Sequence, residues 1–485
     1  MTRAGDGPFS AAGGCRACWW GWVWTWGGGL LYTFWVSGQD LKQDKFTSEP
    51  GPIAPSMGIN APNAAVATAE TPPQLEETPR RSSPWVALRY RDFRLLWLGG
   101  FVSQTGSQMR IVAIGVQLWD LTGDPTALGL LGVFKLVPLV LLSLFGGMIA
   151  DSFDRRKLLI VTQGTFAVTS VLLAVSTQFG WISPALIYGV SALSAATTAF
   201  DNPARSAFVP SLVERRHLPN ALSLNIIVWQ VATIIGPTLG GLFLSMRTSG
   251  FVMIYWIDAV SFGAVMVALG LMHVRPEKGL ARNVSVKAAL EGLRFLRKMP
   301  IIMSTMSLDF FATLFGAATV LLPPFAEQVL RVDRQLWGLL YAAPAMGAVV
   351  AGVVMSWVGN VKRQGLLVIV SVMAYGAATV VFGLAGTFWL AVLGLAGTGA
   401  ADTVSMVMRQ TIRQLNTPDE LRGRMTSVTM LFYIGGPQLG EVEAGFMAAA
   451  IGIGPSIAVG GVAVILLTVL TGYLVPSLRN YRSRD

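Results

Sequence analysis

Repeated apolar runs constrain this 485-residue chain more than any other feature. A helix that crosses the hydrocarbon core of a bilayer needs about 20 consecutive, mostly apolar residues. From residue 95 onward the sequence holds twelve such runs, and the gaps between them are mostly short, so neighbouring helices should be antiparallel. The runs lie near residues 95–119, 125–150, 157–178, 183–203, 220–246, 251–272, 301–326, 336–358, 364–385, 387–408, 423–449 and 453–477. We therefore expect an all-α membrane protein with twelve transmembrane helices.

Charged residues make up only 13% of the chain, whereas soluble proteins carry about 25%. The sequence contains no GxxxxGK[ST] motif and so no P-loop of its own. Cys15 and Cys18 form a CxxC without a second pair or a nearby histidine, and a zinc site needs four ligands. We expect no metal, no other cofactor and no enzymatic activity. A membrane-embedded enzyme would need a cluster of reactive side chains at one depth, and a non-transporting receptor is the other alternative.

Lysine and arginine fix the predicted orientation. If the segment before the first run is cytoplasmic, 27 of these cations lie inside and three, Arg247, Arg331 and Arg334, lie outside. Short cytoplasmic loops of membrane proteins carry such an excess of cations. We expect a multi-pass inner-membrane protein with both termini in the cytoplasm, and the net charge of +10 signals topology, with no nucleic-acid partner.

The longest segment between runs, residues 273–300, divides the chain into six runs on each side. We expect an N-terminal six-helix bundle over 85–272, a C-terminal bundle over 301–478 and a cytoplasmic tail over 479–485. Within the linker, SVKAALEGLRFLRKMP has the period of an amphipathic helix on the inner membrane surface. GPTLG in the fifth run and GPQLG in the eleventh occupy equivalent positions. This recurrence predicts a duplicated 6+6 arrangement.

Residues 1–84 differ from the rest of the chain. Trp and Gly dominate Cys18–Val36, and residues 48–84 are rich in Pro, Ala, Ser and Glu. The composition of residues 48–84 is typical of disorder. We expect a disordered or mis-annotated extension, with Met57 as the start of the protein, and an extra helix or a signal segment is the alternative.

A short charged turn, GGMIADSFDRRKLL at Gly146–Leu159, separates the second and third runs. We expect Asp151 to end one helix, and Arg155 and Arg156 to open the next, on the cytoplasmic side. Topology alone explains the cations but not the preceding Gly147 and Asp151. The turn predicts a charge cluster that pairs with a neighbouring helix end in one conformation and releases it in another.

This turn resembles the helix 2–3 signature of the major facilitator superfamily, G-x-L-A-D-R-x-G-R-K-x-x-L, with Ser152 and Asp154 as departures. FDNPARSAFVPSLV at Phe200–Val213 and PDELRGRM at Pro418–Met425 look like the branch of enterobactin exporters and related drug-efflux proteins, the transmembrane secretion effectors. The resemblance implies alternating access between two bundles, with Asp151 in a gating charge relay.

The resemblance covers about residues 88–478. The matching turn of the second half, GVVMSWVGNVKRQG, has Ser356 where the acid would stand. We therefore expect the gating relay to be one-sided.

The stretch TIIGPTLGG in the fifth run combines a proline with small residues. Gly236, Gly240 and Gly241 form a face that lets helices approach closely, and Pro237 frees a backbone carbonyl and bends the helix. The stretch resembles the fifth-helix motif of antiporters in this superfamily, with Ala232 where that motif has an earlier glycine. Tight packing alone is the alternative, and the resemblance favours export.

Ionisable residues inside the runs should face a cavity or a partner, because each costs about 2.5–3.5 kcal/mol at a helix centre. The resemblance implies a cavity lined by helices 1, 4, 7 and 10, so Arg110, Asp309 and Asp402 are our candidates for proton or substrate binding. Asp402 ends the small-residue stretch GLAGTGAAD, which leaves room beside its carboxyl. Glu441 is a weaker candidate because its helix usually stands outside the cavity. The alternative is structural ion pairing, for example of Arg110 with Asp309 or Asp402.

Together these features predict a secondary transporter, a proton-coupled exporter of amphipathic small molecules. Its partners would be a small-molecule substrate, protons and the lipid bilayer, and we expect a monomer. A siderophore exporter and a lysolipid flippase are the alternatives within the transporter class.

Overall fold

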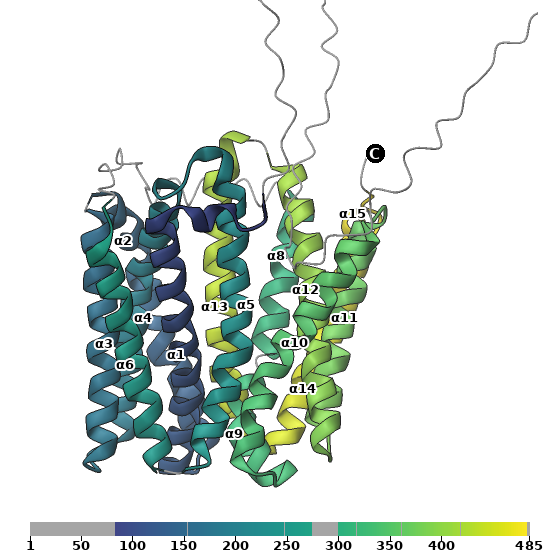
Figure 1. The fold of residues 1–485 in the computed structure, drawn as a ribbon. Coiled ribbons are helices and arrows are strands. Elements are labelled where there is room, and N and C mark those ends of the chain that lie inside the picture. The colour runs from purple at the N-terminus through teal and green to yellow at the C-terminus, as the bar shows by residue number, and fades with distance from the viewer. Residues whose placement is uncertain are drawn as a thin grey trace, which may run out of the picture.

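The computed structural model describes residues 83–482, except 153, 247, 274–298, 317, 360 and 418, and omits the side chains of 144–152, 318, 419–434. The described residues form helices joined by short turns, with no strand among them (Figure 1). The predicted disordered extension and the predicted amphipathic linker helix therefore fall outside the described residues.

The N-terminal half of the described chain begins with a short 3-10 helix and continues with six long helices. These elements are η1 Val86–Arg89, α1 Arg91–Thr122, α2 Pro125–Ser152, α3 Arg155–Gln178, α4 Pro184–Phe208, η2 Val209–Ser211, η3 Arg215–His217, α5 Leu218–Leu244 and α6 Thr248–Leu271. Local chemistry sets their ends. Gly123 ends α1 with a φ of 60°, a conformation that glycine adopts without strain. The hydroxyl of Ser183 accepts the amide N–H of Leu186 and so caps α4.

The C-terminal half begins at Pro300. Its elements are α8 Pro300–Gly316, η4 Ala318–Leu321, α9 Leu322–Pro324, η5 Phe325–Leu330, α10 Arg334–Val358, α11 Gln364–Gly383, α12 Phe388–Asn416, α13 Asp419–Ile451, α14 Ile453–Leu474 and α15 Pro476–Arg479. The apolar run predicted over 301–326 lies within one segment, Pro300–Leu330, that is long and apolar enough to cross a membrane. Within this segment the described residues change from the α-helix α8 to the 3-10 helix η4 and the π-helix η5. Pro323 and Pro324 lie there, and prolines lack the N–H that a helix interior needs.

In the described part of the chain, nine helical segments are long and apolar enough to cross a membrane. They overlap nine of the apolar runs, from Pro125–Ser143 to Ile453–Leu474. Three further long helices, α1, α4 and α13, lie at the remaining runs but are not among the nine.

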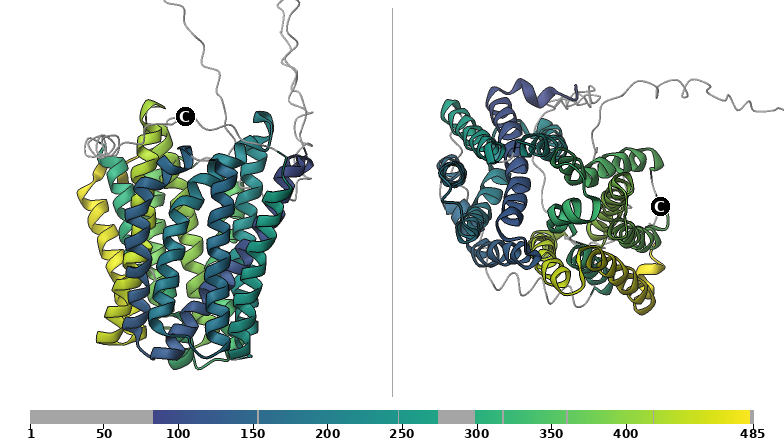
Figure 2. Two further views of the ribbon diagram at one scale, coloured as in Figure 1. Left: turned by 90° about the vertical axis from the view of Figure 1, so that its left-hand side faces the viewer. Right: turned by 90° about the horizontal axis from the view of Figure 1, so that it is seen from below.

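Each half packs mainly within itself. In the N-terminal half, α1 packs against α5 and α6, α3 against α4 and α6, and α2 against α4. In the C-terminal half, α12 packs against α10 and α11, and α14 against α11 and α8. Viewed along the helix axes, the two halves lie on opposite sides (Figure 2). Two helix pairs make most of the contacts between them, α2 with α13 and α5 with α10.

The two GPxLG segments pack alike. A Cβ on Gly236 of α5 would lie 2.8 Å from the carbonyl oxygen of Thr105 on α1. A Cβ on Gly436 of α13 would meet the hydroxyl of Thr313 on α8. Each glycine therefore permits close contact with the first long helix of its own half.

The first and last described elements, η1 and α15, lie at the same end of the molecule (Figure 1). We call this the terminal end and the opposite one the far end. Contacts between the halves reach the far end, where α2 and α13 meet at Gly129 and Gly445, and α5 and α10 at Gly241 and Gly338.

Candidate functional site

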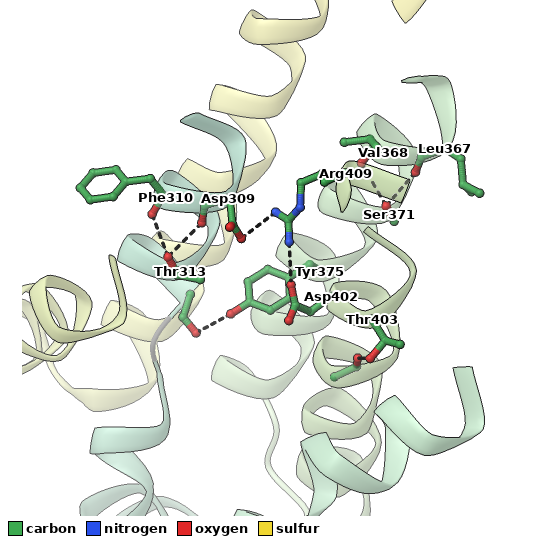
Figure 3. Close-up of polar contacts among 12 residues, drawn as sticks. Asp309, Phe310, Thr313, Leu367, Val368, Ser371, Tyr375, Asp402, Thr403 and Arg409 are labelled. Atoms are coloured by element: carbon green, nitrogen blue, oxygen red, sulfur yellow. Dashed lines mark hydrogen bonds and ion pairs between the residues drawn. The ribbon is translucent and has the colours of Figure 1, made fainter. Parts of the chain in front are cut away.

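A buried arginine on α12 joins two of the predicted acids. Nη1 of Arg409 lies 2.8 Å from Oδ1 of Asp309 on α8, and its Nη2 lies 3.2 Å from Oδ1 of Asp402 on α12 (Figure 3). The arginine side chain is only 5% exposed. One guanidinium thus holds two carboxylates from two helices. With both acids ionised, the trio carries one surplus negative charge.

Helical spacing explains the arrangement on α12. Residues 402 and 409 are seven positions apart, which is about two turns, so they share one face of the helix. The predicted tenth run ended near residue 408, which left Arg409 outside it. The structure corrects this boundary, because α12 continues to Asn416 and includes Arg409. The signal that could have found it is its two-turn distance from a buried acid of opposite charge.

Asp402 also faces a cavity. The cavity has a volume of about 230 Å³ and lies among helices of the C-terminal half. Its walls are formed by Thr313, Gly316, Thr319, Pro344, Tyr375, Thr379, Phe382, Leu395, Thr398, Gly399, Asp402 and Pro437. The side chain of Asp402 is 47% exposed and that of Asp309 17%. Asp402 is therefore the acid of the trio that a ligand or a proton reaches more readily.

Arg110 has a different partner from those predicted. Its Nε lies 3.2 Å from Oδ2 of Asp258 on α6, so the suggested pairing with Asp309 or Asp402 is wrong. Nη1 donates to the hydroxyls of Thr169 and Ser170, each at 3.2 Å.

Two rings complete the surroundings of this pair. The guanidinium carbon of Arg110 lies 5.9 Å from the ring centre of Phe166 and 5.7 Å from that of Phe262. Asp258 is fully buried. The pair is packed inside the N-terminal half, with hydrogen bonds and aromatic faces around the guanidinium. It has the character of the structural ion pair that the sequence left open.

Glu441 lies between the halves. Nζ of Lys135 on α2 is 3.0 Å from Oε2 of Glu441 on α13, and both side chains are mostly buried. The sequence identified Glu441 as an ionisable group inside a run but gave it no partner. The structure places Glu441 apart from Asp309 and Asp402, in a contact that links α2 to α13.

A second set of polar contacts links the halves at the far end. Both terminal guanidinium nitrogens of Arg334, at the start of α10, donate to the carboxylate oxygens of Asp120 near the end of α1, at 2.8 Å each. Beside it, the indole N–H of Trp119 donates to the carboxylate of Glu327 on η5. The sequence predicted only that Arg334 lies in an outer loop. Its pairing with Asp120 could not be predicted, because a contact between residues 214 positions apart leaves no local pattern.

The charged turn joins three helix ends. The carboxylate of Asp154 accepts the amides of Arg156 and Lys157 and caps α3, which explains its departure from the signature. Nη1 of Arg155 donates to the carbonyl of Ala207 near the end of α4, at 3.0 Å. Nη2 of Arg156 donates to the carbonyl of Gly270 near the end of α6, at 2.8 Å. Cations at helix C-termini are favourable.

Two other members of the predicted gating motif lie outside the described side chains. Gly147 and Asp151 belong to the last turns of α2, whose backbone alone is described. The gating role of this motif stays a prediction.

The glycines of the antiporter-like motif face two helices. Gly240 packs against Met109 of α1, where a Cβ would lie 3.5 Å from its Cα. A Cβ on Gly241 would lie 2.5 Å from the amide nitrogen of Gly338 on α10. Pro237 lies inside α5 without ending it. The motif thus supports close packing both within the N-terminal half and across to the C-terminal half.

Comparison with known proteins identifies the family. A family model described as transmembrane secretion effector, within the major facilitator group, matches residues 82–485. The enterobactin exporter EntS of Citrobacter koseri is 27% identical over 390 residues, which cover 80% of this chain and 93% of the relative. EntS of Escherichia coli K12 is 26% identical with the same coverage.

Solved structures share the fold. A bacterial homologue of the human lysosomal transporter Spinster, in an inward-facing conformation, superposes with a TM-score of 0.65 at 15% identity, over 80% of this chain and 98% of that one. A bacterial homologue of the iron transporter ferroportin, also inward-facing, gives 0.61 at 15% identity, over 79% and 98% of the two chains.

The matched family consists of transporters, which agrees with the prediction that the chain is not an enzyme. Within the described residues, no three His, Cys, Asp or Glu side chains are grouped as a metal site would require. The helices, the acid–arginine trio and the match over nearly the whole described chain lead to one conclusion: this protein is a multi-pass membrane transporter of the transmembrane secretion effector family, within the major facilitator superfamily.

Proposed function

We propose that the protein is a proton-coupled exporter of amphipathic small molecules that works by alternating access between two six-helix bundles. The helix packing supports this division, since each half packs mainly within itself and only α2–α13 and α5–α10 join the halves extensively. The equivalent packing of Gly236 and Gly436 supports an internal repeat. Residues 85–272 and 301–478 would form the bundles, with 273–300 as their connection.

The observation that carries the coupling proposal is the sharing of Arg409 by Asp309 and Asp402. One guanidinium cannot neutralise two carboxylates, so the site holds an unbalanced charge in an environment that penalises it. A proton or a cation on Asp402 removes the imbalance. Protonation would therefore change the stability of the trio and the charge of the adjoining cavity wall, as coupling requires.

We infer that the described conformation is closed at the far end. The pair of Asp120 with Arg334, the contact of Trp119 with Glu327 and the close approach of Gly241 to Gly338 all hold the halves together there. The predicted bias of lysine and arginine would put the terminal end in the cytoplasm. The state would then be inward-facing, ready to load a substrate for export.

A proton gradient supplies enough free energy for such export. One charge moving through 100 mV releases about 2.3 kcal/mol. Since about 1.4 kcal/mol corresponds to a tenfold concentration ratio, one proton per cycle sustains a gradient of roughly forty-fold for a neutral substrate, whereas exchange for a monovalent cation is driven by the pH difference. ATP is not required.

Ethidium uptake tests this proposal. Inverted membrane vesicles that contain the protein and trapped DNA should accumulate ethidium, a permanent amphipathic cation, when acidified inside. A protonophore should abolish the accumulation, and vesicles without the protein should show none. Accumulation that withstands the protonophore would contradict proton coupling.

A siderophore exporter is the second candidate, because the enterobactin exporters are relatives that align over 93% of their length. Deleting the gene from its host should then reduce siderophore in iron-limited culture medium, and restoring the gene should recover it. Unchanged secretion would exclude this candidate.

A further inference from the structure

Five hydroxyl groups lie in the wall of the cavity beside Asp402, those of Thr313, Thr319, Tyr375, Thr379 and Thr398. The hydrogen bonds of four of them end on backbone carbonyl oxygens of the protein. These bonds run from Thr313 to Asp309 (2.9 Å), from Tyr375 to Gly316 (3.0 Å), from Thr379 to Tyr375 (3.0 Å) and from Thr398 to Leu395 (2.6 Å). A carbonyl oxygen cannot donate, so each of these four hydroxyls uses its only hydrogen in its bond and offers only lone pairs to the cavity.

The charge of the cavity wall, like its hydroxyl groups, suits a cationic hydrogen-bond donor. Asp402 is the charged residue among the described wall residues, and its side chain is 47% exposed. Arg409 is only 5% exposed and is not one of the wall residues, so the acid and not the cation faces the cavity. The cavity therefore presents acceptors and a negative charge, between the apolar surfaces of Phe382, Leu395 and Pro344.

The corresponding charges of the N-terminal half have no such opening. Arg110 and Asp258 are 9% and 0% exposed at their side chains, and the guanidinium of Arg110 lies beside the stacked rings of Phe166 and Phe262. Oδ2 of Asp258 also accepts the hydroxyl of Ser170 at 2.6 Å. The accessible acid thus belongs to the C-terminal half, within one bundle.

We propose that this cavity is the recognition site for a protonated amine attached to an aromatic or other apolar group, with the ammonium on Asp402. The inference rests on the proposed transport function and names its substrate class. An ammonium supplies hydrogen-bond donors to these acceptors and a positive charge to the carboxylate of Asp402. A catecholate or carboxylate would bring a second negative charge and further acceptors into the same space. The site therefore favours cations over the anionic groups of siderophores.

Three catechols of similar size test the proposal, because they differ mainly in charge near pH 7. Dopamine is a cation, catechol is neutral and 2,3-dihydroxybenzoate is an anion. Isothermal titration of purified wild-type protein in lipid nanodiscs, with no gradient, should show dopamine binding at least about tenfold more tightly than 2,3-dihydroxybenzoate, the scale of one charge-assisted hydrogen bond. Catechol should bind with intermediate affinity.

Two variants and a control locate the effect. Asp402→Asn should remove the preference for dopamine, whereas Asp402→Glu should retain it. Asp333→Asn removes an exposed acid that lies before α10, outside the cavity, and should bind like the wild type. A thermal melt of each variant shows that the protein is folded.

The proposal is overturned if 2,3-dihydroxybenzoate binds as tightly as dopamine, if dopamine shows no saturable binding at millimolar concentrations, or if Asp402→Asn preserves the preference. Because the titration uses no gradient, its outcome is separate from that of the ethidium experiment. If dopamine binds preferentially but ethidium uptake does not respond to the protonophore, the recognition site stands and proton coupling is refuted. If ethidium uptake responds to the protonophore but the protein shows no preference for dopamine that depends on Asp402, proton coupling stands and the recognition site is refuted.

Discussion

Arg110 and Arg409 are both buried cations in long helices, but their partners differ in number and access. Arg110 meets one carboxylate, which is fully buried, and two hydroxyls. Arg409 meets two carboxylates, of which one faces a cavity. A balanced, enclosed pair has little to gain or lose during a transport cycle, whereas an unbalanced and accessible trio can exchange a proton. This difference supports our proposal that the pair of Arg110 is structural and that the trio of Arg409 takes part in proton coupling.

The structural assignment of Arg110 predicts a stability defect. Arg110→Met should lower the free energy of unfolding by about 3–5 kcal/mol, because it leaves the buried carboxylate of Asp258 unpaired. The double variant Arg110→Met, Asp258→Leu should recover most of that loss, since it removes both charges. Thermal unfolding in detergent measures both effects. A double variant as unstable as the single one would contradict the assignment.

Residue types alone predicted part of the site, namely its two acids, but not their partner. The cost of a charge in a helix interior singled out Asp309 and Asp402, and the structure brings these two together. The same reasoning could not choose partners, because pairing depends on helix rotation. Arg110 therefore turned out to face Asp258, and Arg409 was missed by an underestimate of where α12 ends.

Among the secondary-structure elements, glycine contacts determine how closely α5 and α10 approach. The helices meet at Gly241 and Gly338 with no side chain between their backbones. The predicted small-residue face on α5 indicated a close contact, although not that its partner would be α10 of the other half. The apolar pattern over 301–326 predicted a spanning segment there, but it did not predict the change of helix type within it.

Substitution at this contact should prevent closure of the far end. Gly241→Val would place side-chain atoms where the amide of Gly338 lies, 2.5 Å from the new Cβ, so we expect protonophore-sensitive ethidium uptake to fall by at least about tenfold, the effect of roughly 1.4 kcal/mol. Gly189→Val is the matched control, because no atom lies within 4 Å of a Cβ at that position on α4. Equal uptake by the two variants would show that the contact is dispensable.

The pair of Asp120 and Arg334 should contribute modestly to the same closure. Both side chains are about a quarter exposed, and such ion pairs are worth roughly 0.2–1 kcal/mol. Arg334→Asp should shift the population toward an open far end by a few-fold, and the reversed pair Asp120→Arg, Arg334→Asp should restore the balance. Distances between spin labels on Leu121 and Gln335 report the shift. No change in their distribution would remove this pair from the gate.

For the whole molecule, two halves that each pack mainly within themselves and are joined chiefly by the helix pairs α2–α13 and α5–α10 fit a rocking motion. The number of apolar runs, the linker position and the repeated GPxLG predicted that plan from sequence, because bilayer thickness and internal duplication leave periodic signals. The contacts between the halves leave no periodic signal in the sequence, because partners such as Lys135 and Glu441 lie 306 positions apart. The asymmetry between a sealed N-terminal ion pair and an accessible C-terminal trio also required the structure.

The central claim is that Asp402 exchanges protons against substrate, and simultaneous flux measurement tests it most directly. Liposomes should contain the purified protein and the trapped pH indicator pyranine, with the membrane potential clamped at zero. Wild-type protein should raise the luminal pH as ethidium enters, and Asp402→Asn should reduce that proton flux at least about tenfold while remaining folded, an effect of roughly 1.4 kcal/mol. Ethidium entry through the wild type without luminal alkalinisation, or an undiminished proton flux in Asp402→Asn, would contradict the account.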